Sequence, residues 1–248
     1  MKKPFNYWPF LGLIILLLLW EFLPSLFHVP SYLFPRFSEV MMAMAQYQTV
    51  IAKNTVITLS EALLGLLLGI TVGGLLGFCM SESSKIARVI QPYIVASNAV
   101  PVIAIAPLIG LWFGHGMVSK VIVAAFLCFF PTALNVYRGL TEIEPIYKEL
   151  FSMLGSNRIE FFAKYKLPHS LPFIFSGLRL SAVYAVIGAI VAEFAGADGG
   201  LGFGMLQSSY NLNTPRLFAY LLIACLLGIG LYGIVGIIEY IYQRKHGS

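Results

Sequence analysis

The stretch TVITLSEALLGLLLGITVGGLLGFCM, residues 55–80, decides the architecture of this chain. Its only charged residue is Glu61, and a helix that spans a membrane needs about 20 mostly apolar residues. A glycine recurs at every fourth position of its second half: Gly65, Gly69, Gly73 and Gly77. One face of the helix therefore carries no side chains, and we expect another helix to approach it backbone to backbone.

This glycine face has two interpretations. It is either a surface that slides during a transport cycle or a static packing seam. In both cases we expect the helix to lie centrally in a bundle and not to face lipid.

The composition of the whole chain agrees with a membrane protein. Of its 248 residues, 58% are hydrophobic and 11% are charged, against about 45–50% and about 25% in soluble globular proteins. Soluble enzymes, nucleic-acid-binding proteins and disordered chains are therefore disfavoured. The three cysteines stand singly in apolar runs without metal-ligand spacing, so we expect buried thiols and no metal site.

The apolar runs predict an all-α integral membrane protein with a single domain over residues 1–248. Pro101 and Pro107 interrupt the third run, where we expect a kink or a break. A short amphipathic helix with Met41, Met42, Met44, Ala45 and Val50 is expected on the outer surface, between the first two spans. Six spans are predicted, at about 8–27, 55–80, 89–113, 117–137, 171–195 and 216–242.

The distribution of positive charge sets the expected orientation, because cytosolic loops carry an excess of Lys and Arg. With both termini in the cytosol, twelve cations fall on that side: Lys2, Lys3, Lys85, Arg88, Arg138, Lys148, Arg158, Lys164, Lys166, Arg179, Arg244 and Lys245. Four fall outside: Arg36, Lys53, Lys120 and Arg216.

The cytosolic loop at residues 138–170 carries start and stop signals for two short helices. Pro145 suits the first turn of a helix, and Gly155 can end that helix in the left-handed conformation. Asn157 and Glu160 form a capping-box pair that starts the second helix. We expect that helix to run to Lys166 and Pro168 to stop it before the chain re-enters the membrane at Leu171.

This loop resembles the "EAA" loop of permease subunits in ATP-binding-cassette (ABC) importers. The family pattern is Glu-Ala-Ala, three residues, Gly, nine residues, then Ile-x-Leu-Pro. Glu149-Leu150-Phe151, Gly155 and Tyr165-Lys166-Leu167-Pro168 match it in spacing, with Leu, Phe and Tyr replacing the two alanines and the isoleucine. The resemblance implies a coupling helix that docks on a separate cytosolic ATPase through Glu149, Leu150, Phe151, Gly155, Leu167 and Pro168. The alternative is a purely structural amphipathic loop.

Further segments are similar to permeases for sulfonates, nitrate, taurine and thiamine-pyrimidine precursors. They include Val100–Leu108, Leu111–Gly116, Gly177-Leu178-Arg179 and Gly196–Gly202. The resemblance implies the type I ABC importer permease fold in the cell membrane, as a homodimer, with a heterodimer left open. It also implies ATPase partners that use ATP and Mg, and an external binding protein. The favoured substrate is a thiamine-pyrimidine precursor or similar heteroaromatic; the alternative is a sulfonate, nitrate or taurine.

Charges within spans are rare and mark functional sites. Glu193, at the outer end of the fifth span, is the strongest candidate, with a buried carboxylate paired to Arg179 or Lys120 as the alternative. Glu193 and Arg179 should lie about 21 Å apart along the same helix, at a rise of 1.5 Å per residue, which excludes a direct pair between them. Ser97, Asn98 and Pro101 complete the predicted translocation path, because broken backbone at membrane depth is tolerated only where it is buried in protein or lines a cavity. A packing role for these three residues is the alternative.

For three further residues the evidence for a functional role is weaker. A structural role is favoured for Glu21, and structural and functional roles are equally favoured for Glu61. His115 is expected to be an exposed turn residue.

No motif predicts catalysis. The chain has no Walker sequence, no His-Glu-x-x-His and no Gly-x-Ser-x-Gly, so we expect a transport subunit whose ATP is hydrolysed by a partner. The rival class is a secondary transporter or channel, which would need no docking loop.

Overall fold

The computed structural model describes residues 7–246, and every regular element in that range is helical. Lys2 and Lys3 lie outside the described residues. The helices are α1 (Trp8–Leu26), α2 (Phe37–Gln46), α3 (Gln48–Glu82), α4 (Ser84–Asn98), α5 (Val102–Phe113), α6 (Met117–Thr141), α7 (Pro145–Met153), α8 (Arg158–Phe161), the π-helical turn η1 (Phe162–Lys166), α9 (Leu167–Phe194), α10 (Leu201–Tyr210) and α11 (Thr214–His246).

Four helical segments within residues 7–246 are long and apolar enough to cross a membrane: α3, α6, the continuous run from α8 to α9, and α11. The pair α4–α5 is bent by 98° and makes a fifth if it counts as one span. The apolar part of α1, Phe10–Leu26, is shorter than the length required of a span. The expected count of six is therefore not reproduced by length and composition alone.

The break in the third span lies at one of the two prolines. α4 ends at Asn98, and Pro101 is the extended residue that precedes α5. By contrast, α5 continues through Pro107, so a break there was a wrong expectation. Proline removes one backbone hydrogen bond of a helix but does not by itself end it.

A single face of α3 is buried along its whole length. It begins with Asn54, Thr58 and Glu61 and continues through the glycines to Met80. A Cβ atom added at Gly69 would lie 2.7 Å from the carbonyl oxygen of Ala125, so the α3 and α6 backbones are in direct contact. The glycine face is thus a packing seam against α6.

The opposite face of α3 is exposed in the single chain, so the expectation that this helix does not face lipid stays a prediction. Leu64, Leu67 and Leu75 are exposed, because no other helix within residues 7–246 covers them. Small residues also join α6 to α9, where an added Cβ at Gly188 would lie 2.6 Å from the Cα of Ala124. Burial of all three cysteines was a wrong expectation, since Cys128 is buried in this core while Cys79 and Cys225 are exposed.

The expected surface helix exists as α2, with one correction. Val50 belongs to α3, which begins at Gln48 after the single residue Tyr47. Val40 and Ala43 of α2 are buried, and Val40 packs in a cluster with Leu201 and Tyr220.

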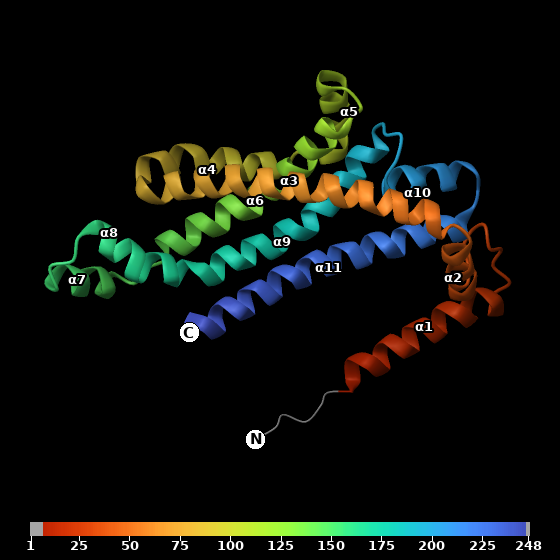
Figure 1. Cartoon of the computed structure of the whole chain (residues 1–248), viewed down its shortest axis with the longest axis horizontal. Coiled ribbons are helices and arrows are strands. Elements are labelled where there is room, and N and C mark those ends of the chain that lie inside the picture. The colour runs from red at the N-terminus through yellow and green to blue at the C-terminus, as the bar shows by residue number, and fades with distance from the viewer. Residues whose placement is uncertain (1–6, 247–248) are drawn as a thin grey trace.

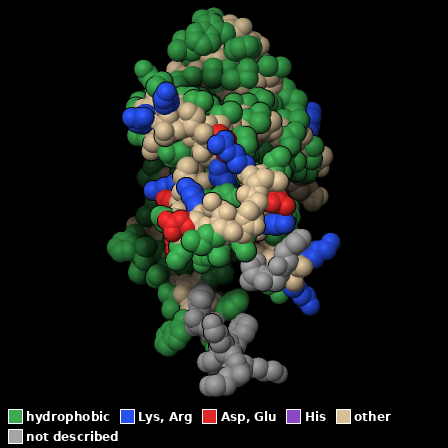
Figure 2. Space-filling view, turned by 90° about the vertical axis from the view of Figure 1, so that its left-hand side faces the viewer, with side chains coloured by type: hydrophobic (Ala, Val, Ile, Leu, Met, Phe, Trp, Pro, Cys, Tyr) green, Lys and Arg blue, Asp and Glu red, His purple; other side chains and the backbone are tan. Residues whose placement is uncertain are grey.

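The two ends of the bundle are formed by different helices. α7 and α8 project at one end, and α2, α5 and α10 lie at the other (Figure 1). Figure 2 views the α7–α8 end, where Lys and Arg side chains gather together with a few acidic ones.

We predict that Gly73→Leu lowers the thermal stability of the protein, whereas Gly74→Leu does not. An added Cβ at Gly73 would lie 2.6 Å from the carbonyl oxygen of Phe129, while one at Gly74 meets nothing within 4 Å. Overpacking of this kind costs about 1–3 kcal/mol. Thermal unfolding of the two variants in detergent, followed by size-exclusion chromatography, measures the difference. Equal stability would contradict the seam.

Candidate functional site

The end of α7 has the geometry that its sequence predicts. Pro145 occupies the first turn, and the helix closes with hydrogen bonds from Ser156 N–H to the Phe151 carbonyl and from Gly155 N–H to the Ser152 carbonyl. This is the Schellman pattern, which requires a left-handed residue, and Gly155 has φ +70°.

The start of the second helix is also as predicted, but its end is not. Asn157 accepts from the Glu160 N–H at 2.9 Å, and Glu160 accepts from the Asn157 N–H at 3.2 Å, which completes a capping box. The chain then passes through η1 directly into α9, and Pro168 lies in the first turn of α9. Because η1 continues into α9 without a break, Pro168 lies inside one helical run and does not stop it, although proline removes one backbone hydrogen bond there.

Aromatic rings fix α7 against the second helix. Tyr147 stacks on Tyr165 with ring centroids 4.6 Å apart, and Phe151 meets Phe161 edge-on at 5.3 Å. Phe151, one of the predicted coupling residues, therefore packs within the pair rather than outward.

The outer side of the pair is apolar and uncovered. Leu150 is 48% exposed, and Glu149 and Gly155 are exposed as well. Leu167 and Pro168 lie at the start of α9, and Leu167 is 38% exposed. Four further apolar side chains at this tip are more than half exposed: Ile146, Met153, Leu154 and Ile159.

At the opposite end, Glu193 joins three helices. It lies in the last turn of α9 and is 1% exposed. Its Oε1 accepts from the Thr58 hydroxyl of α3 at 2.6 Å, and its Oε2 accepts from the Gly202 N–H of α10. The Thr58 oxygen also accepts from the Leu201 N–H at 2.8 Å. Both carboxylate oxygens of Glu193 are thus bonded by the chain itself.

The glycine-rich loop before α10 is shaped by this carboxylate. Gly200 has φ +104°, and any Cβ there would overlap the Glu193 carboxyl group. The Gly200 N–H donates to the side-chain oxygen of Asn54 at 3.3 Å, and the Asn54 amide donates to the Tyr220 hydroxyl at 3.1 Å.

The proposed salt-bridge partners of Glu193 are engaged elsewhere. Arg179 pairs with Glu239 at 2.5 Å, so the exclusion of an Arg179–Glu193 pair is confirmed. Lys120 donates to the backbone carbonyl of His115. Glu21 accepts from the backbone and hydroxyl of Ser38, at 2.9 and 2.8 Å, which is the structural role favoured for it.

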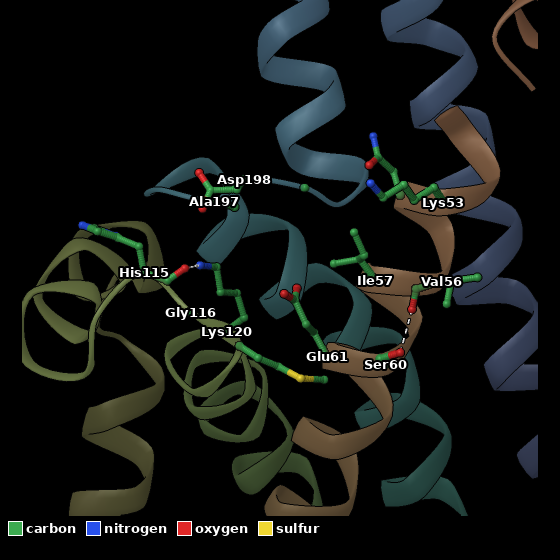
Figure 3. Close-up of a pocket in the computed structure, with 13 residues that line it drawn as sticks. Lys53, Val56, Ile57, Ser60, Glu61, His115, Gly116, Lys120, Ala197 and Asp198 are labelled. Carbon is green, nitrogen blue, oxygen red and sulfur yellow. Dashed lines mark hydrogen bonds between the residues drawn. The ribbon is translucent and has the colours of Figure 1, made fainter. Parts of the chain in front are cut away.

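A pocket of about 470 Å³ opens beside this network (Figure 3). It lies between the first turns of α3, the turn before α6 and the loop before α10. Its lining includes two buried charged side chains, Glu61 and Lys120, which are 4% and 3% exposed. His115, expected to be exposed in its turn, is exposed and lies on the pocket rim.

The predicted translocation path is not brought together within one subunit. Ser97, Asn98 and Pro101 lie at the α4–α5 bend, and none of them lines the pocket beside Glu193. Sequence reasoning missed Lys120 and Asp198 as pocket residues. Thr58 was missed as well, although it lies on the same helix face, seven residues before Gly65.

The fold is that of ABC importer permease subunits. An inward-facing structure of the MetNI methionine ABC transporter matches with a TM-score of 0.69, over 79% of this chain and 97% of that one, at 17% identity. An amino acid ABC transporter matches with a TM-score of 0.62, over 82% and 97%, at 19% identity.

The chain belongs to the family of binding-protein-dependent transport system inner membrane components, whose model matches residues 65–245. A probable ABC transporter permease of Haemophilus influenzae is 35% identical over 90% of this chain and 91% of its own. The formylaminopyrimidine transport permease ThiX of Halalkalibacterium halodurans is 35% identical over 89% and 88%. The riboflavin transport permease RibX of Chloroflexus aurantiacus is 32% identical over 97% and 92%.

We predict that Thr58→Val destabilises the protein, whereas Thr71→Val on the same helix does not. Removal of the Thr58 hydroxyl leaves the Leu201 N–H and one oxygen of Glu193 without a partner, at about 1–3 kcal/mol for each buried group. The Thr71 hydroxyl is exposed and bonds only the Leu67 carbonyl of its own helix. Thermal melts of both variants in detergent check this, and equal melting points would rule out the network as a structural tie.

Proposed function

We propose that this permease subunit carries a small heteroaromatic solute of the pyrimidine type into the cell. The observation that carries the proposal is the pair of long matches to permeases named for formylaminopyrimidine and riboflavin, at 35% and 32% identity. A sulfonate and a taurine permease match over 69% and 70% of the chain, at 31% and 29% identity. A sulfonate or taurine substrate is therefore the second candidate.

Two cytosolic ATPases that use ATP and Mg are the proposed motor, with a second permease copy and an external binding protein as further partners. The uncovered apolar tip of α7 supports this proposal. Leu150, Met153 and Leu154 are exposed at the end of the molecule where charged side chains gather. A secondary transporter or channel would have no use for that tip. The gathering of Lys and Arg at the α7–α8 end supports a cytosolic position for it and for the C-terminus.

The coupling role predicts that Gly155→Asp weakens co-purification of the ATPase, whereas Ser156→Asp does not. Asp at a left-handed position costs about 1–2 kcal/mol and distorts the end of α7, while Ser156 has no positive φ. An added Cβ at Gly155 meets nothing within 4 Å, so the cost comes from the backbone alone, and the thermal stability of the permease by itself should fall by no more than this amount. An ATPase that binds both variants as well as it binds wild type would contradict this role.

The substrate is tested by uptake of labelled formylaminopyrimidine into cells that express this chain with its ATPase and binding protein. We expect uptake at least tenfold above that of cells lacking only this chain, and no competition from excess taurine. Entry of labelled taurine without entry of labelled formylaminopyrimidine would overturn the proposal.

A further inference from the structure

The pocket beside the Glu193 network is lined by both apolar and ionisable side chains. Val56, Ile57 and Met117 are apolar, and Glu61 and Lys120 are ionisable. Its volume of about 470 Å³ lies in the range of small-molecule sites, about 300–1,000 Å³.

The two buried carboxyl groups at this place differ in how their bonds are satisfied. Glu193 has both oxygens bonded by Thr58 and Gly202. Glu61 lies against the carboxyl group of Glu193, and its Oε2 receives no hydrogen bond from any donor in the described chain. Figure 3 shows the Glu61 carboxyl pointing into the space between Lys120 and the loop with Ala197 and Asp198. Glu193 is the structural carboxyl, and Glu61, which lines the pocket, keeps a buried oxygen that lacks a donor among the residues that the structure describes.

Lys120 faces the same space without closing on a carboxylate. Its ammonium donates to the His115 carbonyl, and no salt bridge of Lys120 occurs among residues 7–246. Charged side chains buried in a membrane protein are costly unless they are paired, and they mark functional sites. One acceptor and one donor therefore line this cavity with hydrogen-bonding capacity left over.

We propose that this pocket binds a single-ring aminopyrimidine-type solute, whose amino N–H donates to Glu61 and whose ring nitrogen accepts from Lys120. The ring would lie against Val56, Ile57 and Met117. An aminopyrimidine carries a donor beside an acceptor, which matches the two polar groups of the pocket. The inference deepens the proposed function and rests on it for the class of solute.

The test uses 4-aminopyrimidine and 4-(dimethylamino)pyrimidine, in which two methyl groups replace the amino hydrogens while the ring nitrogens stay. Ligand-observed NMR measures their binding to the full chain in lipid nanodiscs. We expect wild type to prefer 4-aminopyrimidine by about tenfold or more, because a buried oxygen left without a hydrogen bond costs about 1–3 kcal/mol. Glu61→Met should abolish this preference by weakening only the amino probe. Lys120→Met should weaken both probes, since both keep the ring nitrogen.

The controls separate contact from folding. Glu21→Gln removes a carboxylate that caps Ser38 away from the pocket and should leave both affinities unchanged. Glu61→Gln, which keeps the shape of the side chain, should lower the preference even if Glu61→Met does not fold. Failure of wild type to bind 4-aminopyrimidine, or equal weakening of both probes by both Glu61 variants, would overturn the inference.

The uptake assay separates the pocket from the proposed function. Normal uptake of formylaminopyrimidine by a Glu61→Gln variant would refute the pocket and leave the substrate standing. Wild-type cells that fail to take up formylaminopyrimidine would refute the substrate whatever the pocket binds.

Discussion

The buried face of α3 is the constraint on which the rest of the bundle depends. Helices in a bilayer gain little from hiding apolar side chains, because lipid is as apolar as leucine, so they associate by close packing and polar contacts. Four glycines along this face bring α6 into backbone contact, and α6 in turn meets α9 at Gly188. The order α3, α6, α9 follows from these contacts, and the bulky leucines of α3 are left on the outside.

The same face explains where the polar site lies. N-terminal to Gly65, the same face of α3 continues through Glu61, Thr58 and Asn54 at helical spacing. A buried polar group must find a partner within the protein, because no water reaches it. The carboxyl of Glu193 and the N–H groups of the loop before α10 supply these partners for Thr58 and Asn54, whereas Oε2 of Glu61 is left without one in the described part of the chain. One face of α3 therefore provides both the close packing against α6 and the buried hydrogen bonds of the polar site.

Local signals were readable from the sequence, and signals that depend on distant contacts were not. The left-handed Gly155 and the Asn157–Glu160 capping box each involve residues within a few positions, so the type of residue determined the geometry. The prominence of Glu193 could be predicted from its place in an apolar span. Its partners could not, since Thr58 lies 135 positions away along the chain. The bend after α4 was foreseen at Pro101, but its angle depends on packing.

The error at Pro168 changes how the two ends of the molecule are connected. A helix that stopped there would place a hinge between the α7–α8 tip and the membrane. Instead one helical run of 37 residues extends from Arg158 to Phe194, about 55 Å at 1.5 Å per residue. Glu193 lies at its far end, so one helical run connects the tip to the residue that ties α3 and α10 together. The π-helical turn at Phe162–Lys166 is the one place in this run where the regular α-helical bonding changes among the described residues. Any bending of this run is therefore expected at η1 rather than at the proline.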